Sequence, residues 1–222
     1  PGRKDGDFWR MGRALFAASF RKGDIVHNTF SYHLTPAGHM MEAGAHACGC
    51  IVIPAGIGNT EQQIEAITQL KPSKYVGTPS FLRILLEKAD SLGVDVSSIT
   101  HGAVGGEALP PSLRDYFKER DVVVLQAYGT ADIGLIAYES EVVEGMIVDE
   151  EIILEIVRPG TGHPVPVGEV GEVVVTSLNP YYPLIRFATG DLSALLPGGS
   201  PCGRTNTRIK GWMGRADQTT KV

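Results

Sequence analysis

Four short stretches of the chain combine glycine with residue types that bind ligands. They are Gly105-Gly106-Glu107, Tyr128-Gly129-Thr130-Ala131-Asp132, Thr189-Gly190-Asp191 and Gly214-Arg215-Ala216-Asp217. Glycine lets a flat ligand approach the backbone, and a tyrosine ring can stack on it. A carboxylate can hold a divalent cation or accept hydrogen bonds from two vicinal hydroxyls, and a guanidinium can bind phosphate. The set indicates a binding site for a ring, hydroxyls and a metal-linked phosphate.

Each stretch taken alone also has a plain structural explanation. Gly105-Gly106 could be a tight strand-to-helix turn, and Tyr128 could be a core residue. Asp132 could cap a helix, and Asp191 could be an ordinary turn residue. Arg215 could belong to an exposed ion pair. Only the order and spacing of the stretches make the ligand interpretation specific.

The second stretch follows the apolar run 122–125, which is short and rich in valine and is therefore expected to be a buried strand. We expect this strand to stop at a turn at Tyr128-Gly129 and to deliver Asp132 to the edge of a sheet. In parallel α/β sheets, ligands bind just beyond the carboxyl ends of the strands. The stretch is therefore placed where a ligand would bind.

Strand and helix patterns alternate five times up to about residue 138, which predicts an α/β fold with a parallel sheet and crossover helices. Asp7 is expected to cap the first helix, and Thr78 with Pro79 to start a later one. That later helix has an apolar stripe of Leu82, Leu85, Leu86 and Ala89. The strands are expected at 25–30, 50–54, 74–77, 99–104 and 122–125.

After about residue 139 the pattern changes to strands separated by glycine and proline turns. Strands are expected at 152–157, 170–176 and 184–187, with no strong helix between them. We therefore predict two domains, an α/β subdomain over residues 1–138 and a smaller, mostly antiparallel β subdomain over 139–222.

Composition excludes several classes of protein. The 222 residues are 43% hydrophobic and 20% charged, with a net charge of −5, so nothing favours binding to nucleic acid or to a membrane surface. No apolar run approaches the roughly 20 residues that span a bilayer, and the polar residues 1–7 do not resemble a signal peptide. Three cysteines indicate a reducing compartment, so a cytoplasmic location is expected.

The order of the four stretches resembles the motif series of the adenylate-forming (AMP-binding) superfamily, in its phenylacetate–CoA ligase-like branch. Further similarity lies at 50–54, 184–187 and 202–205, so the resemblance runs nearly end to end. It implies a ligase that uses ATP to convert a carboxylic acid into an acyl-adenylate and then transfers the acyl group to CoA. An aromatic acid similar to phenylacetate would be the substrate.

The resemblance also implies roles for single residues. The residues that it places around the nucleotide are Gly105, Gly106, Glu107, Tyr128, Gly129, Thr130, Asp191 and Arg215. Asp132 stands where the family has a metal-binding glutamate, so it is expected to be catalytic and to bind Mg²⁺ together with ATP. Tyr32, His33 and Gly134 match the region that lines the acyl pocket. Asp217 matches the hinge to a C-terminal domain.

The chain departs from the family pattern in ways that bear on activity. Ala131 replaces a hydroxyl residue, and Asp132 is one methylene shorter than glutamate. The family's phosphate loop would precede residue 1, and its catalytic lysine would follow residue 222, so the chain is expected to be an inactive fragment of the large N-terminal domain. Some relatives hold a structural zinc, but here the matching positions are Ser140, Ile147 and Ser200, which leaves Cys202 alone. A closed zinc site needs four ligands, so no zinc is expected.

Two other interpretations remain open at this point. The changes at Ala131 and Asp132 also fit a non-catalytic domain of the same fold that acts as a scaffold or binds a partner. A dinucleotide-binding oxidoreductase is disfavoured, because no G-x-G-x-x-G motif follows the first strand. The identity of the acid stays open, and so does self-association, for example as a homodimer.

Overall fold

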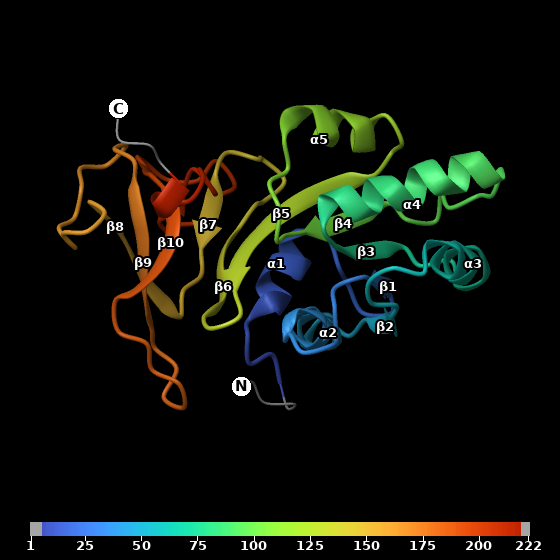
Figure 1. Ribbon diagram of the computed structural model, residues 1–222, viewed down its shortest axis with the longest axis horizontal. Coiled ribbons are helices and arrows are strands. Elements are labelled where there is room, and N and C mark those ends of the chain that lie inside the picture. Colours follow the sequence, from blue (N-terminus) through green and yellow to red (C-terminus); the bar gives the residue numbers. More distant parts are fainter. Residues whose placement is uncertain (1–5, 219–222) are drawn as a thin grey trace. The chain divides into compact units, whose positions relative to one another are not determined.

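A computed structural model describes residues 6–218, and the chain divides into two compact units between Gly134 and Leu135. The first unit contains a parallel sheet with helices on both faces, and the second contains antiparallel strands (Figure 1). This combination confirms the predicted fold class.

The parallel sheet of the first unit has the strand order β2-β1-β3-β4-β5. Because β1 pairs with both β2 and β3, the chain reverses its direction of winding after β2. Because all five strands run parallel, their carboxyl ends face one edge of the sheet, where ligands bind in such folds. The strands are β1 (Ile25–Asn28), β2 (Ile51–Pro54), β3 (Lys74–Gly77), β4 (His101–Val104) and β5 (Val123–Thr130).

Helices cover the two faces of this sheet. One face lies against α4 and α5, and the other lies against α1 and α2 (Figure 1). The core of the first face includes residues of α3, α4 and α5, among them Ile67, Leu82, Leu85 and Phe117. The helices are α1 (Met11–Ala17), α2 (Ala37–Ala47), α3 (Thr60–Leu70), α4 (Pro79–Leu92) and α5 (Pro111–Lys118).

Local sequence explains where α4 and α1 begin. Thr78 Oγ1 accepts a hydrogen bond from the Phe81 amide, and Pro79 occupies the first turn of α4, as predicted. The Asp7 carboxylate accepts from the amides of Met11 and Gly12, at 3.0 and 2.6 Å, so it caps α1 from outside the helix. The helix itself is short, from Met11 to Ala17.

The backbones of α1 and α2 approach closely where two glycines face each other. A Cβ added to Gly44 would lie 2.7 Å from the Gly12 amide nitrogen and 2.7 Å from the Met11 Cβ. Since real Cβ atoms do not approach backbone this closely, glycine at 44 sets the distance between the two helices.

The second unit contains two groups of antiparallel strands. In one group β7 pairs with β6 and with β12, and β12 pairs with β11. The other group is a three-stranded sheet of order β10-β9-β8. The strands are β6 (Gly134–Tyr138), β7 (Met146–Val148), β8 (Ile152–Val157), β9 (Gly171–Ser177), β10 (Phe187–Ser193), β11 (Leu195–Leu196) and β12 (Arg208–Ile209). A short 3₁₀ helix, η1, covers Ala216–Gln218.

Two expectations about strands are wrong. The predicted turn at Tyr128-Gly129 is part of β5, which continues to Thr130 before the chain turns at 131–133. The strand expected at 184–187 begins only at Phe187 and runs to Ser193. Arg186 prevents an earlier start, because it has a left-handed backbone (φ 50°) and its guanidinium is bound to Glu155 and to the Gly162 carbonyl.

Candidate functional site

The loops that follow β4 and β5 meet at one cavity of about 200 Å³ in the first unit. Gly105 and Gly106 of the first loop and Gly129 near the end of β5 line it, and so do side chains that follow β1 or lie on α1 and α2. None of the lining residues carries a charge. They are Met11, Phe30, Thr35, Pro36, Ala37, Met40, Met41, Gly105, Gly106, Ala127, Gly129, Thr130 and Ala131. Four predicted site residues, Gly105, Gly106, Gly129 and Thr130, are thus brought together.

Backbone geometry accounts for the two glycines after β4. A Cβ at Gly105 would lie 2.8 Å from the Ala127 carbonyl oxygen, so only glycine fits against β5. Gly106 has a φ of 77°, which residues with side chains rarely adopt. A Cβ on Gly106 would lie 3.7 Å from the Phe30 ring, on the cavity side of the loop.

Glu107 follows Gly106 in the loop after β4, and Tyr128 precedes Gly129 in β5. Glu107 is exposed, and its backbone carbonyl accepts a hydrogen bond of 2.9 Å from Gln126 Nε2, which ties the loop after β4 to β5. Tyr128 is a half-buried residue of β5, two positions after Gln126. Sequence reasoning missed Gln126, whose type gave no signal of this bond.

Asp132 lies on the turn after β5 and is exposed. Thr130 Oγ1 accepts a hydrogen bond from the Ile133 amide at 3.1 Å, which closes the turn. Mg²⁺ at nucleotide sites is held by one or two carboxylates together with substrate phosphates. A single exposed carboxylate such as Asp132 therefore fits a magnesium ion that arrives with ATP.

Tyr32 and His33 are not among the residues that line the cavity. Tyr32 Oη accepts a hydrogen bond from Asn28 Nδ2 at 2.7 Å, and its ring packs edge-on against His39. Burial, reinforced by the charge of Glu42, raises the pKa of the Tyr32 hydroxyl, so it stays protonated. His33 is exposed. The aromatic side chain that this loop contributes to the cavity is Phe30.

A buried network supports the edge of the sheet beneath these loops. Thr29 Oγ1 lies 2.8 Å from Tyr75 Oη, and Tyr75 Oη donates to the Thr78 carbonyl at 3.0 Å. Tyr75 is fully buried, and a Cβ on Gly77 would overlap Thr29 and Tyr75. The network joins the ends of β1 and β3 to the start of α4. The sequence did not predict this network, because Tyr75 lies inside a predicted strand and its hydrogen-bond partners are not evident from residue type.

In the second unit, Asp191 and Arg215 contact each other directly. They form an antiparallel β-bridge, and Arg215 Nη1 donates to Asp191 Oδ1 at 3.2 Å and to the Thr189 carbonyl at 3.0 Å. Trp212 Nε1 also donates to Asp191 Oδ1, at 3.0 Å. The hydrogen bond to Asp191 raises the pKa of Arg215, which stays charged.

This second cluster explains two of the remaining sequence features. A Cβ on Gly190 would lie 2.7 Å from Arg215 Nη2, so the guanidinium packs over the glycine. Asp217 lies 3.5 Å from Arg215 Nε and is exposed. Thr189-Gly190-Asp191 and Gly214-Arg215-Ala216-Asp217 are thus neighbours in space, a relationship that their resemblance to separate motifs did not specify. Trp212 was missed.

The family model described as AMP-binding enzyme matches residues 11–180. The chain belongs to this AMP-binding enzyme family. The resemblance that the motifs indicated is thereby confirmed.

Several relatives of this AMP-binding chain are phenylacetate–coenzyme A ligases. The Thermus thermophilus ligase is 34% identical over 215 residues, which are 93% of this chain and 48% of the relative. The Escherichia coli K12 ligase is 32% identical over 226 residues, 97% of this chain and 51% of the relative. The chain therefore spans about half the length of these relatives.

Solved structures of CoA ligases have the same fold as the AMP-binding chain. A 2-hydroxyisobutyryl-CoA ligase in an open conformation, in complex with 2-HIB-AMP and CoA, superposes with a TM-score of 0.88 and 25% identity over 96% of this chain and 50% of that one. An anthranilate CoA ligase in complex with anthranoyl-AMP superposes with a TM-score of 0.70 at 19% identity, which shows the fold alone.

The segment around Cys202 contains a thiol in a polar environment. Ser200 Oγ lies 2.9 Å from Cys202 Sγ, and Arg204 Nη1 lies 3.6 Å from it. The hydrogen bond with Ser200, assisted by Arg204 and Ser140, lowers the pKa of Cys202 to about 6. Ser140 and Ser200 thus both interact with the Cys202 thiol.

Within residues 6–218, no group of three or more His, Cys, Asp and Glu side chains is arranged to hold a metal ion. The absence of zinc nevertheless stays a prediction. Cys48 and Cys50 make structural contacts instead, with their thiols donating to the carbonyls of Gly12 and Arg21. Over the same described part of the chain, no helix is both long and apolar enough to cross a membrane.

Proposed function

We propose that the chain is part of an acid–CoA ligase that activates a compact aromatic carboxylic acid, similar to phenylacetate. The acid's carboxylate attacks the α-phosphorus of ATP, which forms the acyl-adenylate and releases pyrophosphate. The CoA thiol then attacks the acyl carbonyl and displaces AMP. The phenylacetate–CoA ligases among the relatives support this assignment of the reaction.

The observation that carries the proposal is the uncharged cavity at the carboxyl ends of β4 and β5. Its volume of about 200 Å³ is below the roughly 300–1,000 Å³ of sites for drug-sized ligands, so it suits a small acid. Phe30 and the methionines at 11, 40 and 41 can pack against an apolar ring. Glycines at 105, 106 and 129 leave room for a ligand against the backbone.

Single residues take the following roles in the proposal. Gly105, Gly106 and Glu107 lie along the adenine and Tyr128 stacks on it, while Gly129 and Thr130 complete this wall. Tyr32, His33 and Gly134 border the acyl-binding region without lining the cavity itself. Asp191 accepts hydrogen bonds from the ribose hydroxyls, Arg215 reaches the nucleotide, and Asp217 is the hinge of a domain rotation.

Asp132 would hold Mg²⁺ bound to the phosphates of ATP, where the ion neutralises charge that develops as pyrophosphate leaves. The residue's part is to present one carboxylate from a closed turn. The shorter Asp132 and the missing hydroxyl at Ala131 give a second candidate function, a non-catalytic scaffold that keeps the fold but not the reaction.

Two measurements test the proposal. Isothermal titration of this chain with AMP should show binding, and the chain alone should form no CoA thioester. The whole protein, incubated with ATP, Mg²⁺ and a series of aromatic and aliphatic acids, should release pyrophosphate fastest with a small aryl acid. Release with none of the acids would favour the scaffold, and a clear preference for long-chain acids would contradict the assigned substrate class.

A further inference from the structure

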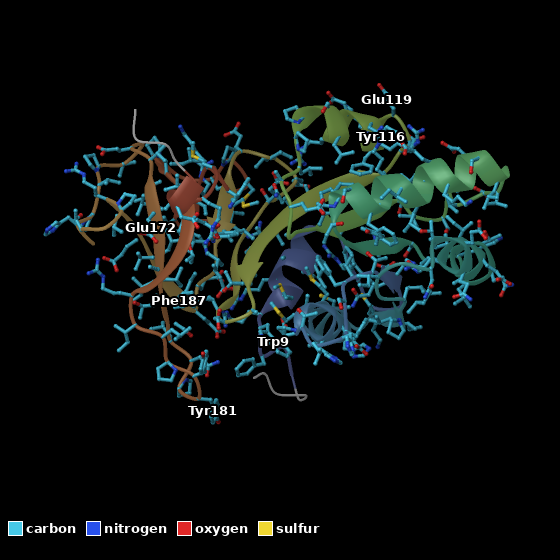
Figure 2. The ribbon with its side chains drawn as sticks, in the orientation of Figure 1. Trp9, Tyr116, Glu119, Glu172, Tyr181 and Phe187 are labelled. Atoms are coloured by element: carbon cyan, nitrogen blue, oxygen red, sulfur yellow. The ribbon has the colours of Figure 1, made fainter. Side chains whose placement is uncertain are left out.

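The segment Trp9–Arg10–Met11 packs against the turn that carries Asp132, and Figure 2 labels Trp9 just before α1. Arg10 donates from Nη2 to the Ile133 carbonyl at 2.9 Å, across 123 residues of sequence. The side chain is only 6% exposed, which is unusual for a cation. A buried guanidinium must be well bonded to offset the loss of its hydration. Arg10 is therefore an integral structural partner of the turn.

Backbone contacts show how closely the segment and the turn fit. A Cβ on Gly134, which has a φ of 82°, would lie 2.7 Å from the Trp9 carbonyl oxygen. A Cβ on Gly129 would lie 2.5 Å from the Gly134 carbonyl oxygen and 3.3 Å from the Met11 Cε. Gly129 and Gly134, which flank the turn at 131–133, are therefore both packed tightly against neighbouring backbone. The hydrogen bond from Arg10 reaches the turn between these two glycines.

The backbone of Arg10 itself is in an uncommon conformation. Its φ of 63° and ψ of 18° are left-handed, a conformation that is strained for an L-residue with a side chain. Asparagine or glycine would adopt this conformation more readily. A residue that keeps a long cationic side chain at such a position does so for a contact that smaller residues cannot make, and here that contact includes the Ile133 carbonyl.

We infer that Arg10 is a positioning residue that holds the turn at 131–133 and thereby fixes where the Asp132 carboxylate points. The inference rests on the proposed function, since Asp132 matters for catalysis only if the protein activates an acid with ATP and Mg²⁺. Arg10 touches neither nucleotide nor acid in this scheme. Its effect passes through the Ile133 carbonyl and the turn closed by Thr130.

The test compares two whole-protein variants that each remove one buried cation from the first unit. Arg10→Met keeps the apolar stem and removes the donor. Lys74→Met is the matched control, because Lys74 is also 6% exposed but pairs with Asp24 at the start of β3, the end opposite the site. Arg10→Lys retains a charge and a donor and serves as the conservative variant.

The first readout is amide hydrogen exchange in the peptide that covers 130–134, measured without nucleotide or metal. Arg10→Met should speed exchange there about tenfold, Arg10→Lys should restore part of the protection, and Lys74→Met should leave this peptide unchanged. Unchanged exchange in Arg10→Met, or an equal increase in Lys74→Met, would overturn the inference.

The second readout is the Mg²⁺ concentration that gives half-maximal pyrophosphate release. Arg10→Met should raise it about tenfold and leave the KM for the acid within twofold, whereas Lys74→Met should change neither. Equal changes in both constants would overturn the role in positioning Asp132. If the unsubstituted protein releases no pyrophosphate, the proposed function fails, while hydrogen exchange still decides whether Arg10 holds the turn.

Discussion

Asp191 and Arg215 lie side by side across an antiparallel bridge, with Oδ1 and Nη1 separated by 3.2 Å. The carboxylate is mostly buried, and Trp212 Nε1 donates to the same oxygen. The arrangement fixes the direction of a carboxylate in a strand, and the arginine beside it stays charged. A carboxylate held in a fixed direction suits recognition of vicinal hydroxyls.

Replacing Asp191 with Asn should weaken AMP binding by about 10- to 100-fold. The change keeps the shape and removes the charge, and a hydrogen bond to a charged group contributes about 1.5–3 kcal/mol. Isothermal titration with AMP measures the loss. Glu169→Gln is a matched control, since Glu169 forms an exposed ion pair with Arg158 in the same unit, and it should change the affinity less than twofold.

Gly106→Ala and Gly58→Ala separate a backbone effect from a site effect. The two glycines have φ values of 77° and 72°, so each substitution should lower the free energy of unfolding by about 1 kcal/mol. A Cβ at Gly58 has nothing within 4 Å, while at Gly106 it would contact Phe30 at the cavity. Denaturant unfolding should show similar losses, and only Gly106→Ala should weaken binding of AMP or the acid. Equal binding by both variants would remove Gly106 from the site.

Lengthening Asp132 to glutamate should preserve or increase pyrophosphate release by the whole protein, because the family's usual residue then meets the metal. Asp132→Asn should reduce release at least 100-fold, since the amide cannot replace a charged metal ligand. Ala131→Thr should lower the KM for ATP by adding a hydroxyl for phosphate. If the protein is instead a non-catalytic scaffold, none of the three variants should differ from the unsubstituted protein in pyrophosphate release.

Cys202 should be the thiol that reacts first with iodoacetamide. Its pKa is lowered to about 6, whereas burial raises the pKa of Cys50 to about 11. Alkylation of Cys202, followed by mass spectrometry, should rise with a midpoint near pH 6, and Ser200→Ala should move the midpoint upward. A midpoint near the ordinary value for cysteine would contradict the hydrogen bonds seen around this sulfur.

The same lowered pKa links Cys202 to stability. Because the folded pKa lies below the ordinary value of 9.0, the thiolate's contribution is complete above about pH 9 and is lost as the pH falls through about 6. Cys202→Ala should therefore flatten the pH dependence of unfolding between these values. The double variant with Ser200→Ala should show no further flattening.

Local sequence patterns predicted the helices and strands of the first unit, because helix capping and apolar periodicity depend on residues that are close in sequence. Thr78 with Pro79 starts α4, and the apolar stripe from Leu82 to Ala89 is buried, as expected. The predicted turn at Tyr128-Gly129 was wrong because Gly129 belongs to β5, where it packs closely against Gly134 across the turn that follows. Glycine in a strand and glycine in a turn look alike in sequence.

The sequence predicted the site residues that belong to recognisable motifs. It did not predict the residues whose role depends on contacts between distant parts of the chain. Gly105, Gly106 and Gly129 were recognised from their spacing and line one cavity. Arg10 and Gln126 act through the backbone carbonyls of Ile133 and Glu107, and residue type alone does not reveal such partners. Phe30, rather than Tyr32, reaches the cavity because Tyr32 is bonded to Asn28.

The glycine contact between α1 and α2 gives the protein a simple means of changing the size of its cavity. Met11 belongs to one helix and Met40 to the other, and both contribute walls to the cavity. A methyl group added at Gly44, which itself does not line the cavity, would push the helices apart and move both walls. A single substitution could thus resize the cavity without altering any residue that lines it.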